Sequence, residues 1–180
     1  MDRLNWDDYF FDIMHSVAKR ATCNRGRSGC VITRNNRIIS TGYVGAISKA
    51  GSCDDLGHVL EQRRRIYRGP KVEVDPGLDW DTATNSWVGK ISEHCIRTIH
   101  AEMNAILYAA KAGVSLDGAT LYCTMTPCRN CAMSIITVGI KTVKCEKVYH
   151  CAKESEKMFS DFGIILEYKT TEVMQYDKTV

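Results

Sequence analysis

His100-Ala101-Glu102 and Pro127-Cys128-Arg129-Asn130-Cys131 are separated by a spacer long enough for about one helix and one strand. One imidazole and two thiolates suit a tetrahedral zinc, and three protein ligands leave its fourth position open for water. Zinc lowers the pKa of such a water to about 7, and a nearby carboxylate can accept the released proton. The spacing therefore predicts a hydrolytic site in which His100, Cys128 and Cys131 bind zinc and Glu102 accepts and donates protons.

The residues between the two motifs support this interpretation. Residues 103–112 are strong helix formers followed by Gly113, a usual residue after a helix end, and residues 119–124 are typical of a strand. Pro127 suits the first turn of a second helix that runs to Gly139. Two helix N-termini would then face one metal, where the helix dipole favours thiolate over thiol. The alternative is an ordinary helix start with buried cysteines, or a redox pair for Cys-x-x-Cys.

Length and charge limit the classes of protein that remain. The chain has 180 residues and a net charge of +3, from 24 basic and 21 acidic side chains, without a long basic block. We therefore expect neither a nucleic-acid partner nor, because no apolar run approaches membrane-spanning length, a membrane partner. The chain has nine cysteines, an odd number, and no recognisable signal peptide. We therefore expect a reducing cytoplasm and metal-bound thiolates and not a disulfide scaffold.

Apolar periodicity along the chain predicts the order α-β-β-α-β-α-β-α-β. Besides the elements above, we expect helices at residues 5–21 and 152–162, and strands at residues 29–33, 37–41, 142–149 and 164–168. Asn35-Asn36 would form a hairpin turn between the first two strands. This order predicts a five-stranded sheet covered by helices on its faces. We expect a single domain over residues 1–170, an insertion without regular periodicity at 46–93, and a C-terminal tail at 171–180.

A second metal site is predicted from the remaining cysteines and histidines. Cys53-x4-His58 has reasonable ligand spacing, and Cys23 and Cys95 complete four ligands with no open position, as in a structural zinc. Such a site would hold the insertion against the core. His94 is the alternative to His58, and ordinary cysteines without metal are the alternative to the site. The other four cysteines are expected to fill the core: Cys30, Cys123, Cys145 and Cys151.

Taken together, these motifs resemble the deoxycytidylate (dCMP) deaminases of the cytidine-deaminase superfamily, including bacterial and phage forms. The resemblance extends from Thr22 to Tyr168 and rests on these segments: Gly29–Ile32, Gly42-Tyr43-x-Gly45, His100–Ile106, Gly118–Tyr122, Pro127–Ala132 and Gly139–Lys141. It implies a three-layer α-β-α fold with a mixed five-stranded sheet. It also implies hydrolysis of dCMP to dUMP and ammonia in support of thymidylate synthesis, activation by dCTP, inhibition by dTTP, and a homohexamer.

The resemblance also implies roles for individual residues. Backbone groups of Ala101 and Thr126 would hydrogen-bond the amide edge of the pyrimidine, and Tyr149 would stack on the base or close the pocket. Arg27 is the candidate for the 5′-phosphate. For Arg27 and Tyr149, a solvated loop arginine and a strand-end aromatic are equally open interpretations.

The glycine-rich turn Gly42-Tyr43-Val44-Gly45 differs from the family at one residue. Many members have Asn where this chain has Val44, which lacks a hydrogen-bonding side chain, so side-chain contacts of that position with a nucleotide are in doubt. We nevertheless expect an allosteric site for dCTP and dTTP around this turn, with Mg²⁺ offsetting the triphosphate charge. Its residues would be Gly42, Tyr43, Val44, Gly45 and Lys49.

Two rival functions remain open. One is a related deaminase that acts on nucleosides, deoxynucleoside triphosphates or a base of the guanine or riboflavin pathways. The other is a nucleic-acid-binding zinc module that uses Arg25, Arg27 and the basic run Arg63-Arg64-Arg65. Glu102 argues against the second, because a structural zinc needs no carboxylate beside it.

Overall fold

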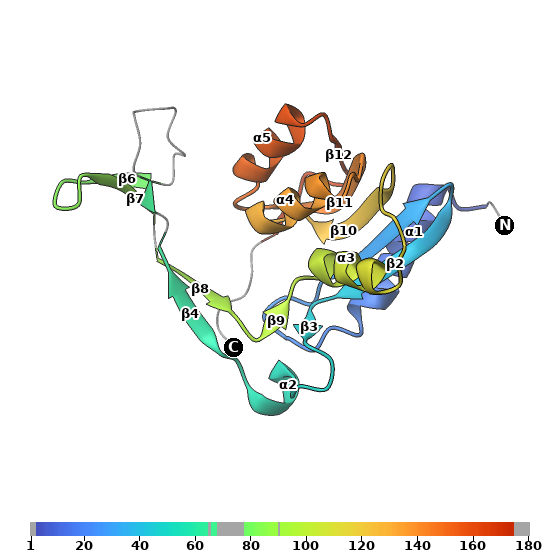
Figure 1. Ribbon diagram of the computed structural model, residues 1–180, viewed down its shortest axis with the longest axis horizontal. Helices are drawn as coiled ribbons and strands as arrows, with labels where there is room; N and C mark the ends of the chain where they lie inside the picture. The colour runs from blue at the N-terminus through green and yellow to red at the C-terminus, as the bar shows by residue number, and fades with distance from the viewer. Residues whose placement is uncertain (1–2, 65, 68–77, 90, 175–180) are drawn as a thin grey trace. The chain divides into compact units, whose positions relative to one another are not determined.

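The computed structural model describes residues 3–64, 66–67, 78–89 and 91–174. The chain divides into two compact units, which are residues 1–57 together with 98–180, and residues 58–97. Figure 1 shows the larger unit as a sheet with helices packed on it. Among the described residues, no helix has the length and apolar character needed to cross a membrane.

The sheet of the larger unit has the predicted mixed five-stranded core. Its strands lie in the order β12-β11-β10-β1-β2. The pairs β2–β1 and β1–β10 are antiparallel, whereas β10–β11 and β11–β12 are parallel. The bounds are β1 Gly29–Arg34, β2 Arg37–Tyr43, β10 Thr120–Met125, β11 Thr142–Tyr149 and β12 Ile165–Tyr168. Each of the five strands expected from the sequence is therefore present, within three residues at either end.

The turn between β1 and β2 follows from two asparagines. Asn35 and Asn36 both have positive φ, 53° and 56°. Asn tolerates this left-handed backbone better than most residues, and two such residues in a row form the turn that matches the twist of a hairpin. The predicted hairpin at Asn35-Asn36 is confirmed.

Helices cover both faces of the sheet, so the central strands β1 and β10 are buried along nearly their whole length. Cys30 and Ile32 of β1 face α3 (Ala101–Lys111), α4 (Arg129–Thr137) and α5 (Lys153–Asp161), in one core with Ile135 and Phe159. Val31 points the other way and packs against α1 (Trp6–Ala18) with a smaller cluster of Phe10, Phe11, Met14 and Tyr122. The three-layer α-β-α architecture is confirmed.

Gly42 lets α3 approach the sheet more closely than any side chain would allow. A Cβ at this position would lie 2.2 Å from the Ala101 oxygen and 2.4 Å from the Ala105 nitrogen. Two hydrogen bonds also join β2 to this helix. The Ser40 hydroxyl donates to the Ala105 carbonyl at 2.6 Å, and the Asn104 side-chain amide donates to the Tyr43 carbonyl at 2.7 Å. These contacts fix the start of α3, which carries His100 and Glu102.

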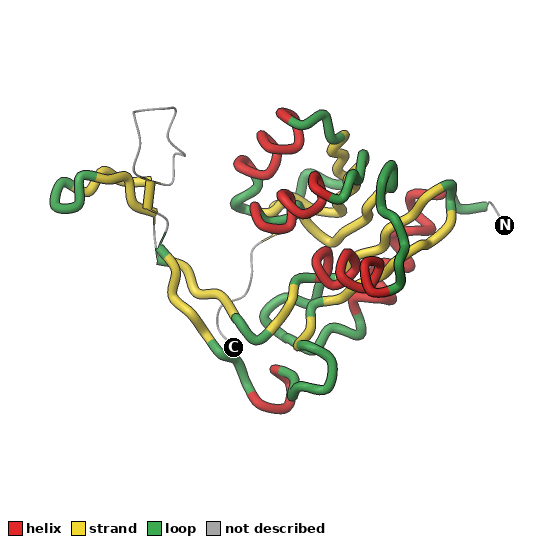
Figure 2. Tube along the Cα trace, viewed as in Figure 1, coloured by secondary structure: helices red, strands yellow, loops and turns green. Residues whose placement is uncertain are grey.

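Residues 46–93 contain more regular structure than the sequence predicted. The helix α2 (Cys53–Leu56) is followed by the strands of the smaller unit, which Figure 2 shows as yellow segments. There β4 (Leu60–Arg63) pairs with β8 (Ser92–Cys95), and β7 (Ser86–Gly89) pairs with both β5 (Ile66–Tyr67) and β6 (Leu78–Asp81). All of β4 is exposed, so its side chains carry little apolar periodicity from which a strand could be predicted.

Other expectations need correction or fall outside the described residues. The strand β3 (Gly45–Ala46) pairs with β9 (Thr98–Ile99), and β13 (Val173–Met174) pairs with β11 inside the expected tail. Two-residue strands are too short to show a period. Cys30, Cys123 and Cys145 are buried as expected, but Cys151 is exposed and does not fill the core. Arg65, residues 69–77 and the last part of the tail, residues 175–180, lie outside the described part of the chain.

We predict that Gly42→Ala lowers the free energy of unfolding by about 2–3 kcal/mol, because backbone atoms of α3 must move to admit the methyl group. Urea unfolding followed by circular dichroism measures this loss. Gly163→Ala is the matched control: Gly163 has a φ of 67° and nothing within 4 Å of the added Cβ, so only the backbone cost of about 1 kcal/mol is expected. Equal losses in the two variants would contradict the role given to Gly42.

Candidate active site

His100 and Cys128 occupy the same position in two different helices. His100 is the N-cap of α3 and Cys128 the N-cap of α4, both with extended backbone, and neither side chain caps its helix. N-cap positions usually carry Ser, Thr, Asp or Asn, whose replacement costs about 1 kcal/mol. The two side chains instead turn toward one point, together with Cys131 in the first turn of α4. The prediction that Pro127 lies inside this helix is wrong, because the helix begins at Arg129, after the Cys128 cap.

The three ligand atoms have the spacing that zinc requires. The His100 Nδ1 atom lies 3.5 Å from the Cys128 Sγ and 3.5 Å from the Cys131 Sγ, and all three atoms lie within 4.8 Å of one another. Zinc–sulfur and zinc–nitrogen bonds of about 2.3 and 2.0–2.1 Å at a tetrahedral angle place N and S about 3.6 Å apart. The donor set and its spacing therefore fit zinc, held through the Nδ1 atom.

The Glu102 side chain is buried beside these three ligand atoms. It is 7% exposed, and one of its carboxylate oxygens lies 3.8 Å from the Cys131 Sγ, while His100 is exposed and Cys128 half-buried. Burial raises the pKa of Glu102 and the nearby His100 lowers it, with burial the stronger effect. A carboxyl group with a raised pKa can take up and return a proton near neutral pH, as a general acid–base must.

The two thiols of the zinc-binding group differ in acidity. The neighbouring Cys131 and His100 side chains lower the pKa of Cys128 to about 4, against the effect of burial. The neighbouring Cys128 side chain together with burial raises the pKa of Cys131. Cys128 therefore loses its proton more readily than Cys131.

The residues expected to bind substrate lie in different surroundings. Thr126 is 1% exposed and comes two residues before Cys128, and its hydroxyl accepts a hydrogen bond of 3.0 Å from the Tyr149 backbone N–H. The rings of Tyr149 and His150 lie 4.3 Å apart. Arg27 is exposed, donates to the Ala21 carbonyl, and lies 3.4 Å from Asp54 of α2. Its assignment to the phosphate remains a prediction.

The residues named as a glycine-rich turn lie mostly in strands, because Gly42 and Tyr43 end β2 and Gly45 begins β3. Gly42 meets the first turn of α3 and so serves the packing of that helix. Val44 is half-buried, packs against the main core, and exchanges backbone hydrogen bonds with Ser28 and Thr22. Lys49 is exposed, with a φ of 71°.

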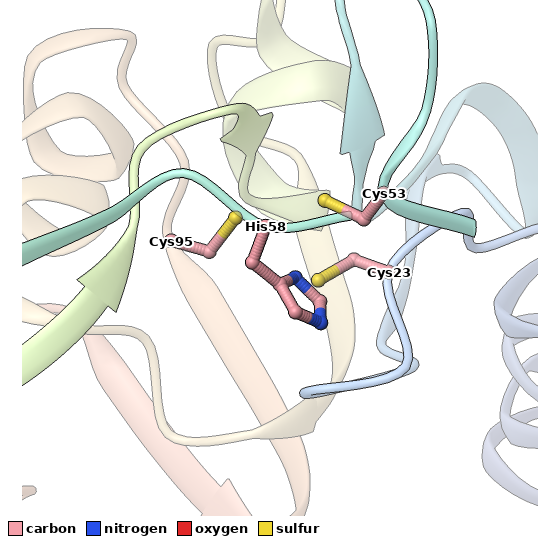
Figure 3. A group of neighbouring side chains, drawn as sticks. All are labelled: Cys23, Cys53, His58 and Cys95. Atoms are coloured by element: carbon pink, nitrogen blue, oxygen red, sulfur yellow. The ribbon is translucent and has the colours of Figure 1, made fainter. Parts of the chain in front are cut away.

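A second group of ligand atoms comes from Cys23, Cys53, His58 and Cys95. Figure 3 shows their side chains as neighbours, and one ligand atom from each lies within 4.8 Å of the others. Cys23 and Cys53 are buried. His94, the alternative ligand, is not in this group; it lies on β8 opposite Glu61. Three sulfurs and one imidazole are a donor set that suits a closed tetrahedral zinc.

Sequence reasoning missed several residues that support the site. Asn104 and Ser40, which fix α3 on the sheet, were not identified, although Asn104 lies one helical turn after His100. Tyr168 was also missed. Its hydroxyl lies 3.1 Å from the Thr126 hydroxyl and donates to Glu156 at 2.7 Å. No local signal in the sequence connects these residues, which are 42 and 12 positions apart.

Comparison with known proteins agrees with this geometry. The profile of the cytidine and deoxycytidylate deaminase zinc-binding region matches residues 4–147. This chain belongs to that family. The family is the one that the resemblance predicted.

Individual relatives span much of the chain. ComE operon protein 2 of Bacillus subtilis is 35% identical over 177 residues, which cover 98% of this chain and 78% of the relative. The deoxycytidylate deaminase of Enterobacteria phage T2 is 38% identical over 149 residues, 74% of this chain and 76% of the phage protein. The crystal structure of dCMP deaminase from cyanophage S-TIM5, in complex with dCMP and dUMP, matches 93% of this chain and 99% of that chain, with a TM-score of 0.65 and 19% identity. This last similarity concerns the fold.

We predict that Glu102→Gln folds and keeps its zinc but loses turnover by about 10²–10⁴-fold, mainly in kcat, because an amide cannot relay the proton. Steady-state deamination kinetics together with elemental analysis for zinc measure both properties. Glu154→Gln is the matched control, since Glu154 forms an ion pair with Arg129 on the helix surfaces and is expected to change turnover little. Turnover near the wild-type level in Glu102→Gln would contradict the assigned role.

Proposed function

We propose that this protein hydrolyses dCMP to dUMP and ammonia at the zinc-binding group of His100, Cys128 and Cys131. The observation that carries this proposal is the buried Glu102 carboxylate 3.8 Å from a ligand sulfur, beside three ligand atoms at tetrahedral spacing. The phage T2 relative, named a deoxycytidylate deaminase, supports dCMP as the substrate. So does the cyanophage structure with dCMP and dUMP.

In this proposal the protein's own residues bind and move protons. Bound zinc would act as a Lewis acid that lowers the pKa of water in its open position. Glu102 would accept a proton from the attacking water, whose oxygen bonds to C4 of the cytosine, and donate that proton to ring N3. Glu102 would then carry the remaining proton of the C4 hydroxyl to the amine, so that the C4 carbonyl forms, the C4–N4 bond breaks and ammonia departs. Water and dCMP are thus converted to dUMP and ammonia.

Substrate contacts are proposed at both helix starts. Ala101 is the first residue of α3, so its backbone N–H belongs to the first turn, whose N–H groups have no partner within the helix. That group and the backbone of Thr126 would bind the amide edge of the base, and Tyr149 would lie against the ring. Arg27 would bind the 5′-phosphate, and to do so it would give up its ion pair with Asp54, in which the charged atoms lie 3.4 Å apart. An exposed ion pair of this kind is weak enough to exchange.

Regulation and assembly extend the proposal. We infer that dCTP activates and dTTP inhibits at a site around Gly42-Tyr43-Val44-Gly45 and Lys49, with Mg²⁺ accompanying the triphosphate. Gly42 is enclosed by α3, so a ligand there would meet Tyr43, Gly45 and the exposed Lys49, and it would act on α3 through the bond between Asn104 and Tyr43. We also propose a cytoplasmic homohexamer, in which neighbouring subunits would cover exposed apolar side chains such as Leu107 and Tyr108 on α3 and Met133 on α4.

A panel of cytosine substrates tests the function and its regulation together. Ammonia release is expected to be fastest with dCMP, and slower with CMP, deoxycytidine and dCTP as substrates. Added dCTP should raise, and dTTP lower, the apparent affinity for dCMP by about 5–150-fold, the usual range of allosteric coupling. Lys49→Ala should weaken both effects without changing turnover at saturating dCMP. Preference for deoxycytidine would contradict the substrate assignment, and simple competition by dTTP would contradict a separate site.

The second group of ligands supports a further proposal, a structural zinc at Cys23, Cys53, His58 and Cys95. We predict close to two zinc ions per chain by elemental analysis. Cys53→Ser should remove one of them and lower the free energy of unfolding by several kcal/mol, because metal binding contributes to folding. Cys151→Ser, at an exposed cysteine outside both groups, should keep two. One zinc in the wild-type protein would contradict this second site.

A further inference from the structure

Four residues from separate elements form one continuous chain of hydrogen bonds beside the zinc-binding group. The Tyr149 backbone N–H, at the end of β11, donates to the Thr126 hydroxyl at 3.0 Å. The Thr126 and Tyr168 hydroxyl oxygens lie 3.1 Å apart, and the Tyr168 hydroxyl donates to a Glu156 carboxylate oxygen of α5 at 2.7 Å. The chain thus joins β11, the segment after β10, β12 and α5.

The donors and acceptors in this chain fix its direction. Glu156 as a carboxylate only accepts, so the Tyr168 proton points to Glu156 and the Tyr168 oxygen accepts from Thr126. The Thr126 proton is then directed to Tyr168, and its oxygen is left to accept from Tyr149. Each hydroxyl donates once and accepts once, and a chain of this kind is stronger than its separate bonds because each bond polarises the next.

Thr126 connects this series of hydrogen bonds to the metal ligands. Thr126 is 1% exposed and precedes Pro127, which restricts Thr126 to extended backbone, and Cys128 follows as the cap of α4. A second bond, from the Thr126 N–H to the Lys147 carbonyl at 3.2 Å, holds the same residue to β11. The backbone N–H and the hydroxyl of Thr126 are therefore both held in place, two residues before the Cys128 thiolate.

We propose that Tyr168 and Glu156 are positioning residues that hold the Thr126–Cys128 segment in the geometry that zinc binding and turnover require. The proposal rests on the proposed function for its kinetic part, whereas its effect on zinc retention does not. Replacing a residue that hydrogen-bonds a metal ligand commonly changes metal affinity or activity by about 10–100-fold. Tyr168 and Glu156 act one residue further away, through Thr126, so we expect effects at the lower end of this range. Neither side chain touches substrate in this role.

Tyr168→Phe removes the hydroxyl and keeps the ring that packs against the main core. We expect kcat for dCMP to fall about 10-fold with KM little changed. We also expect Tyr168→Phe to lose one zinc during dialysis against a chelator at about a tenth of the concentration that the wild-type protein requires, with zinc measured by elemental analysis. Glu156→Leu should reproduce both effects, and Glu156→Gln, whose amide oxygen still accepts from Tyr168, should restore them to within about threefold. Because the residues act as one chain, the double variant Tyr168→Phe with Glu156→Leu should lose little more than either single variant.

Tyr122→Phe is the matched control. The Tyr122 hydroxyl also donates to a carboxylate at 2.7 Å, that of Asp7, but it does so on the α1 face of the sheet. Both Tyr→Phe variants therefore lose one hydrogen bond to a carboxylate, and Tyr168→Phe also loses the bond from Thr126, so its loss of stability is expected to be somewhat larger. Only the Tyr168 variant should change kcat and zinc retention.

The results separate the positioning role from the proposed function. If wild-type protein does not deaminate dCMP but Tyr168→Phe still releases zinc more readily than Tyr122→Phe, the proposed function fails and the positioning role stands. If wild-type protein deaminates dCMP and the two variants match in kcat and zinc retention, the positioning role is overturned. A loss in Glu156→Gln as large as that in Glu156→Leu would also overturn it.

Discussion

The convergence of two helix N-termini on one point is the constraint on which the rest of this structure depends. Each helix presents its N-cap residue, His100 or Cys128, to the proposed metal site in place of a cap, and so gives up about 1 kcal/mol of local stability. The helix dipoles favour the negative charge that collects there on the thiolates and on Glu102. Zinc would balance that charge, so the metal and the two helices stabilise one another.

Positions far from the metal maintain this convergence. Gly42 allows α3 to lie against β2, while Ser40 and Asn104 fix its rotation. On the other side, Tyr168 and Glu156 reach the segment before Cys128 through Thr126. One helix is therefore held by close backbone packing and the other by a chain of hydroxyl groups. The two helices also lie over different parts of the sheet, since α3 packs on β1 and β2, whereas α4 follows β10, which pairs antiparallel with β1 and parallel with β11.

Much of the architecture and the metal-ligand pattern could be predicted from sequence because the signals are local. His-x-Glu and Pro-Cys-x-x-Cys specify ligands within three residues, Asn35-Asn36 specifies a turn, and apolar alternation specifies the five main strands. The supporting contacts could not be predicted, because each one joins residues far apart in the sequence. Nothing near Tyr168 indicates that it meets Thr126, and the two-residue strands β3 and β13 have no period to detect. Strand β4 was missed because both of its faces are exposed.

Anomalous diffraction at the zinc edge from crystals of the purified protein would test the central claim most directly. The account predicts a peak about 2.0–2.1 Å from the His100 Nδ1 atom and about 2.3 Å from the Sγ atoms of Cys128 and Cys131. Its fourth position should hold a non-protein oxygen within hydrogen-bonding distance of Glu102. A metal bound directly by the Glu102 carboxylate, or no peak between the two helix starts, would contradict the account.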